Sequence, residues 1–276
     1  MAHVLPDPHA VAAALGVDPR VAAALLGGLF AASATSLGAL AAVLVPASRM
    51  SSASGLALVL DVGMAFSSGV MIVASFTSLL LPAIQLGGLA RATAGFIGGA
   101  AAIHVINKVV PHEHIVKGYE GPHVHADMKR KLVAAWLVAM AIIIHNIPEG
   151  MTIGSAAAYE LSKGLAVSIA IGVQDVPEGL AVSLPVLAAT GRRGLAVGLG
   201  VLSGVSELAV AVPTAALGVA AARMLPYLLG FGAGAMVYVV SHEALPESHR
   251  SGHEGKATLG FFAGFLVMLA LDSALG

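Results

Sequence analysis

The chain has 276 residues, of which 58% are hydrophobic and 11% are charged, and this composition excludes a soluble domain, in which about 25% of residues are charged. The formal net charge of -1, without a block of lysine or arginine, argues against a nucleic-acid partner. Because the sequence has no cysteine, disulfides and thiolate metal ligands are excluded, and a bound metal would need histidine, carboxylate, amide or backbone oxygen ligands.

Apolar runs of about twenty residues predict eight transmembrane helices, because each run at 1.5 Å per residue can cross about 30 Å of hydrocarbon. The predicted spans are residues 21–45, 57–81, 87–109, 132–158, 164–189, 194–222, 225–248 and 257–275. Residues 1–20 contain only a short alanine-rich run, which cannot span a membrane and lacks the basic start of a signal peptide. We therefore expect an all-α polytopic membrane protein with an extracellular or periplasmic N-terminal segment, 1–20, and a single transmembrane domain, 21–276.

The lysines and arginines are divided unequally between the connections that alternate along the chain. With the N-terminus outside, ten of the fourteen lie in the inner connections, which leaves Arg20, Arg91, Lys163 and Arg223 outside. Cytoplasmic loops are enriched in lysine and arginine, so both termini are expected outside. The longest connection, residues 111–130, then faces the cytoplasm and contains the histidines His112, His114, His123 and His125.

Glycines recur four residues apart in several spans, so that both members of a pair share one face of a helix. Small residues at this spacing let helix backbones approach closely in lipid. The pairs are Gly95 with Gly99, Gly194 with Gly198, Gly200 with Gly204, Gly230 with Gly234, and Gly260 with Gly264. We expect these faces to be helix packing surfaces.

The most informative feature is a polar hexapeptide that occurs twice in apolar surroundings. His145-Asn146-Ile147-Pro148-Glu149-Gly150 in the fourth span recurs 29 positions later as Gln174-Asp175-Val176-Pro177-Glu178-Gly179 in the fifth. A charge at the centre of a membrane helix costs roughly 2.5–3.5 kcal/mol even on permissive scales, so such residues indicate function. The first two residues of each copy lie four and three positions before its glutamate, and all three therefore share a helix face.

Residue counts place His145, Gln174 and Glu207 about 16–21 Å from the surfaces at which their helices enter the membrane, so three antiparallel helices bring polar groups to one level. Four carboxylates then lie at this depth, those of Glu149, Asp175, Glu178 and Glu207. None of the fourteen lysines and arginines lies there, so protons or bound cations must neutralise the carboxylates. With the neighbouring imidazole and amides, the carboxylates suit two divalent cations that share Glu149 and Glu178.

The hexapeptides HNIPEG and QDVPEG, in consecutive spans, resemble the motifs of the ZIP (Zrt-, Irt-like) divalent metal transporters, and the resemblance extends from about Val21 to Gly276. It implies an eight-helix fold in which the first three and the last three helices form an inverted repeat around helices four and five. It also implies a homodimer. Many members have a histidine-rich motif where this chain has Gln174 and Asp175, and this departure resembles a prokaryotic-type subgroup.

The same resemblance implies two metal positions. One would use His145, Glu149, Gln174 and Glu178, and the other would use Asn146, Asp175 and Glu207 with both glutamates bridging. A further metal station is expected near the cytoplasmic end, formed by His242 and Glu243 of the seventh span with His112 and His114. Further candidates for the path or its gates are Asp61, Met71, Ser78 and Asp272.

These observations and the resemblance predict a transporter, not an enzyme, that moves Zn2+ into the cytoplasm across the inner membrane. Cd2+, Fe2+ and Mn2+ are further candidate substrates, because histidine and carboxylate ligands without thiolate do not choose among these metals. Alternating access would expose the central site to each side in turn as one group of helices moves against another, elevator-like. Two other functions use the same cluster: a proton or monovalent-cation carrier, and an intramembrane metallohydrolase, although HExxH and a separate general base are missing.

Overall fold

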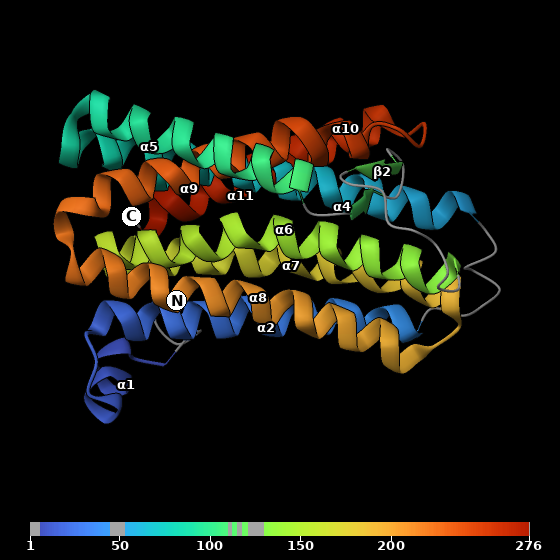
Figure 1. The fold of residues 1–276 in the computed structure, drawn as a ribbon, viewed down its shortest axis with the longest axis horizontal. Helices are drawn as coiled ribbons and strands as arrows, with labels where there is room; N and C mark the ends of the chain where they lie inside the picture. The colour runs from blue at the N-terminus through green and yellow to red at the C-terminus, as the bar shows by residue number, and fades with distance from the viewer. Residues whose placement is uncertain (1–5, 45–52, 110–111, 115–117, 121–129, 276) are drawn as a thin grey trace.

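The computed structural model describes residues 6–44, 53–109, 112–114, 118–120 and 130–275. Its long helices lie side by side in one bundle, with two short strands at one end and helix α1 at the other (Figure 1). The helices are α1 (Pro8–Leu15), α2 (Pro19–Leu44), α4 (Ala53–Ala74), α5 (Leu81–Val109), α6 (Arg130–Tyr159), α7 (Leu161–Thr190), α8 (Arg193–Ala220), α9 (Leu225–Val239), α10 (Leu245–Ser248) and α11 (Glu254–Leu275). The π-helical segments η1 (Ser75–Leu80) and η3 (Val240–Ala244) continue α4 and α9, and the 3-10 turn η2 (Ala222–Met224) precedes α9. Strands β1 (His112–His114) and β2 (Gly118–Glu120) form an antiparallel pair.

Six helical stretches among the described residues are long and apolar enough to cross a membrane. One of them, Leu60–Val109, has 50 residues and is broken at Gly88, whose φ of 76° and ψ of 165° are not helical. This stretch supplies two crossings, because 50 residues of helix are more than twice as long as the hydrocarbon is thick. With the 30-residue helix α6, the described chain has eight crossings, and the predicted all-α polytopic fold is confirmed.

The helix contacts follow the pattern that an inverted repeat requires. The most extensive contacts between the first three and last three crossings pair α2 with α8, α4 with α11, and α5 with α9. In an inverted repeat, α2 corresponds to α8, α4 to α9, and α5 to α11. Exchanging the corresponding helices turns the α4–α11 contact into the α9–α5 contact and leaves the α2–α8 contact unchanged. The two π-helical segments also occupy equivalent places, since η1 follows α4 and η3 follows α9. Helices α6 and α7 contact α2 and α8 and carry both hexapeptides.

Four of the five predicted glycine pairs lie where two backbones approach. A Cβ atom on Gly95 or Gly99 would meet the backbone of α9, and one on Gly230 or Gly234 would meet that of α5. Gly260 and Gly264 lie in the same way against the backbone of α4. Of the last pair, Gly204 lies against the backbone of Ala32 in α2, and Gly200 lies against the Cβ atom of Ala39 in the same helix. The prediction was wrong for Gly194 and Gly198, since a Cβ there would have no described atom within 4 Å.

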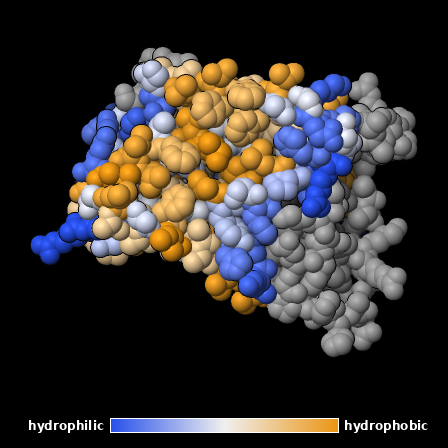
Figure 2. All heavy atoms as spheres, turned by 90° about the horizontal axis from the view of Figure 1, so that it is seen from above, coloured by the Kyte–Doolittle hydropathy of each residue, from blue (hydrophilic) through white to orange (hydrophobic). Residues whose placement is uncertain are grey.

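The outer faces of the bundle are apolar. Large hydrophobic side chains are exposed on α2, α5 and α11, among them Leu37, Leu89, Ile97, Leu259 and Leu266, each more than 60% accessible. Figure 2 shows one face, on which hydrophobic residues cover the middle and hydrophilic residues gather toward both ends. Soluble proteins rarely expose so much apolar surface to water, so this distribution indicates a multi-pass membrane protein.

The N-terminal segment contains a short helix that the sequence reading did not predict. Helix α1 begins where the Asp7 side chain accepts a hydrogen bond from the His9 N–H at 3.0 Å, and it ends at Gly16 with φ of 68°. Asp18 then precedes α2 and forms a two-pronged ion pair with Arg20 at 3.1 Å. The Arg20 guanidinium lowers the pKa of the Asp18 carboxyl below its usual value.

Candidate metal centre

The last glycine of each hexapeptide determines how closely its helix approaches the next one. A Cβ atom on Gly150 of α6 would overlap the carbonyl oxygen of Glu207 in α8, and a Cβ on Gly179 of α7 would overlap the carbonyl oxygen of Thr35 in α2. Only glycine allows these approaches, because any other residue would place a side-chain atom on the neighbouring backbone. The motif that carries the polar residues therefore also brings α8 and α2 against them.

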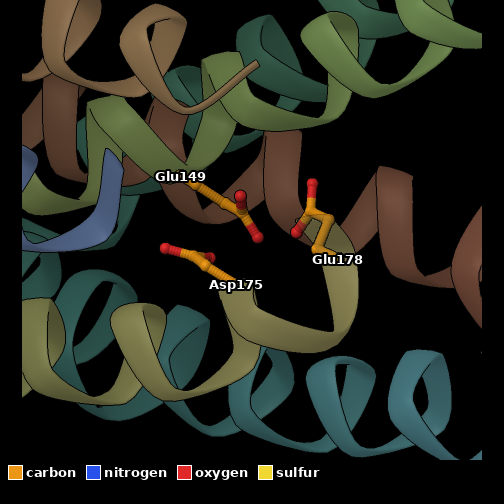
Figure 3. Close-up of side chains that lie close together, drawn as sticks. All are labelled: Glu149, Asp175 and Glu178. Carbon is orange, nitrogen blue, oxygen red and sulfur yellow. The ribbon is translucent and has the colours of Figure 1, made fainter. Parts of the chain in front are cut away.

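Three carboxylates of the hexapeptides meet in the interior of the bundle. Glu149, Asp175 and Glu178 each offer an oxygen atom, and these atoms lie within 4.8 Å of one another. Figure 3 shows the three side chains turned toward one another from α6 and α7. Glu149 and Asp175 are at most 1% accessible, whereas Glu178 is partly buried. The structure thus brings carboxylates of both hexapeptides together in one place.

Two amide side chains donate to carboxylates here, one to Glu149 of the cluster and one to a fourth carboxylate, that of Glu207. Gln174 donates its Nε2 hydrogen to Oε1 of Glu149. Asn146 donates from Nδ2 to Oε1 of Glu207 at 2.8 Å, and the same nitrogen lies 2.9 Å from both the carbonyl and the hydroxyl oxygen of Ser203. Because these nitrogens face acceptors, the amide oxygens of both residues are directed elsewhere.

Several oxygen atoms around the cluster have no hydrogen-bond donor in the described part of the chain. They are Oδ1 of Asn146, Oε2 of Glu149, Oε1 of Gln174, both carboxylate oxygens of Asp175, and Oε2 of Glu207. Leaving a buried acceptor without a partner costs about 1–3 kcal/mol, and more when it is charged. Residues 132–162, 164–191 and 194–222 contain no lysine or arginine that could compensate. A buried set of oxygen ligands with excess negative charge fits a divalent cation.

Comparison with known proteins finds matches over most of the chain. The profile of the family described as ZIP Zinc transporter matches residues 103–272. Zinc transporter ZIPB of Bordetella bronchiseptica is 40% identical over 267 residues, which cover 93% of this chain and 82% of that protein. Zinc transporter GufA of Myxococcus xanthus is 38% identical over 265 residues, which cover 92% of this chain and 99% of that protein. This chain belongs to the ZIP family. Human zinc transporter ZIP11 is a more distant member, 31% identical over 341 residues, with 92% of this chain and 97% of that protein covered.

Some of the metal ligands that the ZIP resemblance implies have side chains that the structure does not describe. The side chains of His145, His112 and His114 lie outside the described residues, as do His123 and His125 entirely. The ring of His242 is 5.1 Å from that of Tyr238. Glu243 is 3% accessible, and its carboxylate accepts a hydrogen bond from Asn107 of α5, a residue that sequence reasoning missed.

Asp61 lies beside a small cavity near one end of the ZIP bundle. Its carboxylate accepts from Ser251 at 3.0 Å and lies 2.8 Å from Nδ1 of His253, so it joins α4 to the segment before α11. The cavity has a volume of about 100 Å³ and is lined by Asp61, Ala181, Glu247 and Ser251 among others. Ala181 follows Glu178 by three residues, so the cavity reaches to within one helix turn of the carboxylate cluster.

The other two polar candidates, Ser78 and Asp272, meet at the opposite end of the bundle. Oδ1 of Asp272 accepts from Nζ of Lys163 at 2.9 Å and from Oγ of Ser78 at 3.1 Å. The side chains of Lys163 and Asp272 are only 17% and 14% accessible. Met71 does not join them, since it is 2% accessible and packs in an apolar cluster with α9.

Two residues next to the cluster were missed by sequence reasoning. Thr35 donates to Oε1 of Glu207 at 3.2 Å, and Ser203 holds the amide of Asn146. The signal for Ser203 was present, because it lies four residues before Glu207 on the same face of α8. No pattern marked Thr35, which stands among the small residues of an alanine-rich span.

Proposed function

We propose that this ZIP protein transports divalent metal ions, foremost Zn2+, into the cytoplasm through the carboxylate cluster. The observation that carries the proposal is the set of donorless, buried oxygen atoms contributed by α6, α7 and α8. The names of the relatives, zinc transporters of Bordetella bronchiseptica, Myxococcus xanthus and humans, support zinc as the substrate. Cd2+, Fe2+ and Mn2+ remain further candidates, because oxygen and imidazole ligands accept them too.

Two metal positions divide the ligands. The first comprises His145, Glu149, Gln174 and Glu178, and the second comprises Asn146, Asp175 and Glu207, with Glu149 and Glu178 shared. Four carboxylates balance the charge of two divalent cations, which explains how so many acids are tolerated in one buried place. The donorless oxygens of Asn146 and Gln174 support their role as neutral ligands.

The helices fall into two groups that suggest which part moves. Helices α2, α6, α7 and α8 contact one another extensively, whereas α4, α5, α9 and α11 form a second group around η1. Every proposed central ligand belongs to the first group, which we propose carries the metal past the second group, elevator-like. Where the two groups meet, Gly63 of α4 lies against Pro177 of α7, so at this point α4 has no side chain that would block sliding of one group along the other.

The two ends of the bundle differ in a way that supports an inward-open state. The cavity beside Asp61 lies between the groups at one end. At the other end, Lys163 of the first group pairs with Asp272 of the second group, which also accepts a hydrogen bond from Ser78 of its own group. With the N-terminus outside, the paired end faces outward and the cavity faces the cytoplasm. We propose that the Lys163–Asp272 pair holds the outer side closed.

Replacing Lys163 with Met is expected to open the outer side. Without the ammonium group, the partly buried Asp272 carboxylate no longer ties the groups together. A Ser75→Cys reporter lies one turn deeper than Ser78, is 1% accessible, and would be the sole thiol because the chain has no cysteine. Its labelling by a membrane-impermeant maleimide added outside should rise severalfold.

The control for this experiment is Arg20→Met, which breaks the ion pair between Arg20 and Asp18. That pair lies at the start of α2 and does not connect the two helix groups. The charge-reversed double variant Lys163→Asp with Asp272→Lys should return labelling to the parent level. Equal labelling of the parent and Lys163→Met proteins, or an equal rise in Arg20→Met, would refute the closing role of the pair.

Zinc uptake by proteoliposomes tests the proposed function against its alternatives. Time-dependent accumulation of Zn2+ above that of empty liposomes is the expected result. Hydrolysis of a membrane substrate without metal flux would favour a metallohydrolase, and isothermal titration without divalent binding would favour a proton or monovalent-cation carrier.

The remaining proposals concern location and assembly. We propose that the protein lies in the inner membrane as a homodimer, with both termini outside. Residues 21–276 would form one domain, preceded by the segment 1–20. The cytoplasmic loop 111–130, with His112 and His114, would pass metal on from His242 and Glu243. Light scattering of the purified protein tests the dimer, and a mass of one chain would contradict it.

A further inference from the structure

The two carboxylate oxygens of Glu207 have different surroundings. Oε1 accepts from Nδ2 of Asn146 at 2.8 Å and from Oγ1 of Thr35 at 3.2 Å. Oε2 has no hydrogen-bond donor among the described residues. A carboxylate oxygen has about two acceptor directions, so Oε1 is saturated and only Oε2 is open to a cation.

Thr35 is held in place for this contact from two sides. Its carbonyl oxygen lies where a Cβ on Gly179 of α7 would be, and its Cβ lies 3.0 Å from the place a Cβ on Gly204 of α8 would take. Thr35 and Glu207 are both 0% accessible. The Thr35 hydroxyl has one hydrogen and two acceptors, since the Ala31 carbonyl is 3.1 Å away, and a charged carboxylate is the stronger acceptor of the two.

A carboxylate with one saturated oxygen binds a metal through the other oxygen alone. Single-oxygen ligation suits Zn2+, which prefers about four ligands, whereas Mn2+ favours octahedral oxygen coordination. Large cations also commonly take both oxygens of one carboxylate. The donors on Oε1 therefore limit how many oxygens the second metal position can offer.

We propose that Thr35 determines cation specificity by keeping Glu207 a single-oxygen ligand, an inference that rests on the proposed metal transport. Loss of the hydroxyl reopens one acceptor direction on Oε1. The site can then supply an additional oxygen, which benefits Mn2+ more than Zn2+. Thr35 thus acts on the metal through Glu207 and does not itself bind the metal.

The test is isothermal titration of the purified full chain with Zn2+ and with Mn2+. Thr35→Val keeps the shape of the side chain and should lower the ratio of Zn2+ to Mn2+ affinity about tenfold, as the loss of a hydrogen bond to a charged group implies. Thr35→Ser restores a hydroxyl and should keep the parent ratio. Thr214→Val, which changes another buried threonine in the same helix as Glu207, is the matched control and should also keep it.

Each outcome bears on one of the two proposals. An unchanged ratio in Thr35→Val, an equal loss of affinity for both metals, or the same change in Thr214→Val would overturn the role of Thr35. A parent protein that binds neither metal would overturn the proposed function itself. If Thr35→Val does not fold, Thr35→Ala, which also lacks the hydroxyl that donates to Oε1, should lower the ratio instead, and an unchanged ratio there would count against the proposal.

Discussion

Zinc uptake by proteoliposomes is expected to fall to the level of empty liposomes when Glu149 and Glu178 are both replaced by glutamine. The two glutamates are the proposed bridging ligands, so the change removes charge from both metal positions at once. Glutamine keeps the size of the side chain, and the fold should survive. Since weaker changes around metal ligands already cost about 10–100-fold, the loss should be at least about 100-fold.

The matched control replaces two glutamates that lie outside the cluster. Glu160 and Glu254 are exposed near the ends of α7 and α11, and changing both to glutamine removes the same total charge. This variant should transport zinc at the parent rate. Uptake at the parent rate by the Glu149 and Glu178 variant, with zinc binding intact in titration, would show that the cluster is not the transport site.

Gly179→Ala is expected to abolish most transport although it adds a single methyl group. That methyl would overlap the carbonyl oxygen of Thr35, so α7 must move away from α2 and take Asp175 and Glu178 with it. Overpacking of this kind costs about 1–3 kcal/mol. We expect uptake to fall at least about tenfold and the melting temperature to fall by roughly 5 °C.

Gly198→Ala provides the comparison for this substitution. A Cβ on Gly198 of α8 would meet no described atom within 4 Å, and alanine is favoured over glycine in a helix by about 0.5–1 kcal/mol. Uptake and melting temperature should therefore be unchanged or slightly raised. If Gly179→Ala behaved like Gly198→Ala, the close contact of α7 with α2 would not be what positions the ligands.

Much of the fold and site could be predicted because membranes impose strong rules on sequence. Hydrophobic run lengths marked all eight crossings, since lipid tolerates only helices with internally satisfied backbones. Helical spacing placed Asn146 and Glu149 on one face of the fourth span, and Asp175 and Glu178 on one face of the fifth, and residue counts put these residues level with Glu207. These inferences need only the geometry of a straight helix and the thickness of the hydrocarbon.

Other features depend on which helices become neighbours, which spacing within one helix does not reveal. Thr35 matters because α2 packs against both α7 and α8, and Lys163 matters because α7 begins beside the end of α11. The pair Gly194 and Gly198 has the same spacing as the other glycine pairs but lies at an open face. The π-helical segments η1 and η3 likewise have no marker in their composition.

Anomalous diffraction from crystals grown with Zn2+ would show directly whether the four carboxylates hold two metal ions, because it counts the ions and identifies the atoms that touch them. We expect two anomalous peaks within about 2.0–2.2 Å of carboxylate oxygens of the cluster, with Glu149 and Glu178 between them. The second peak should contact Oε2 of Glu207 and not Oε1. Zinc peaks at surface histidines alone, with none at the four carboxylates, would contradict the proposed metal site.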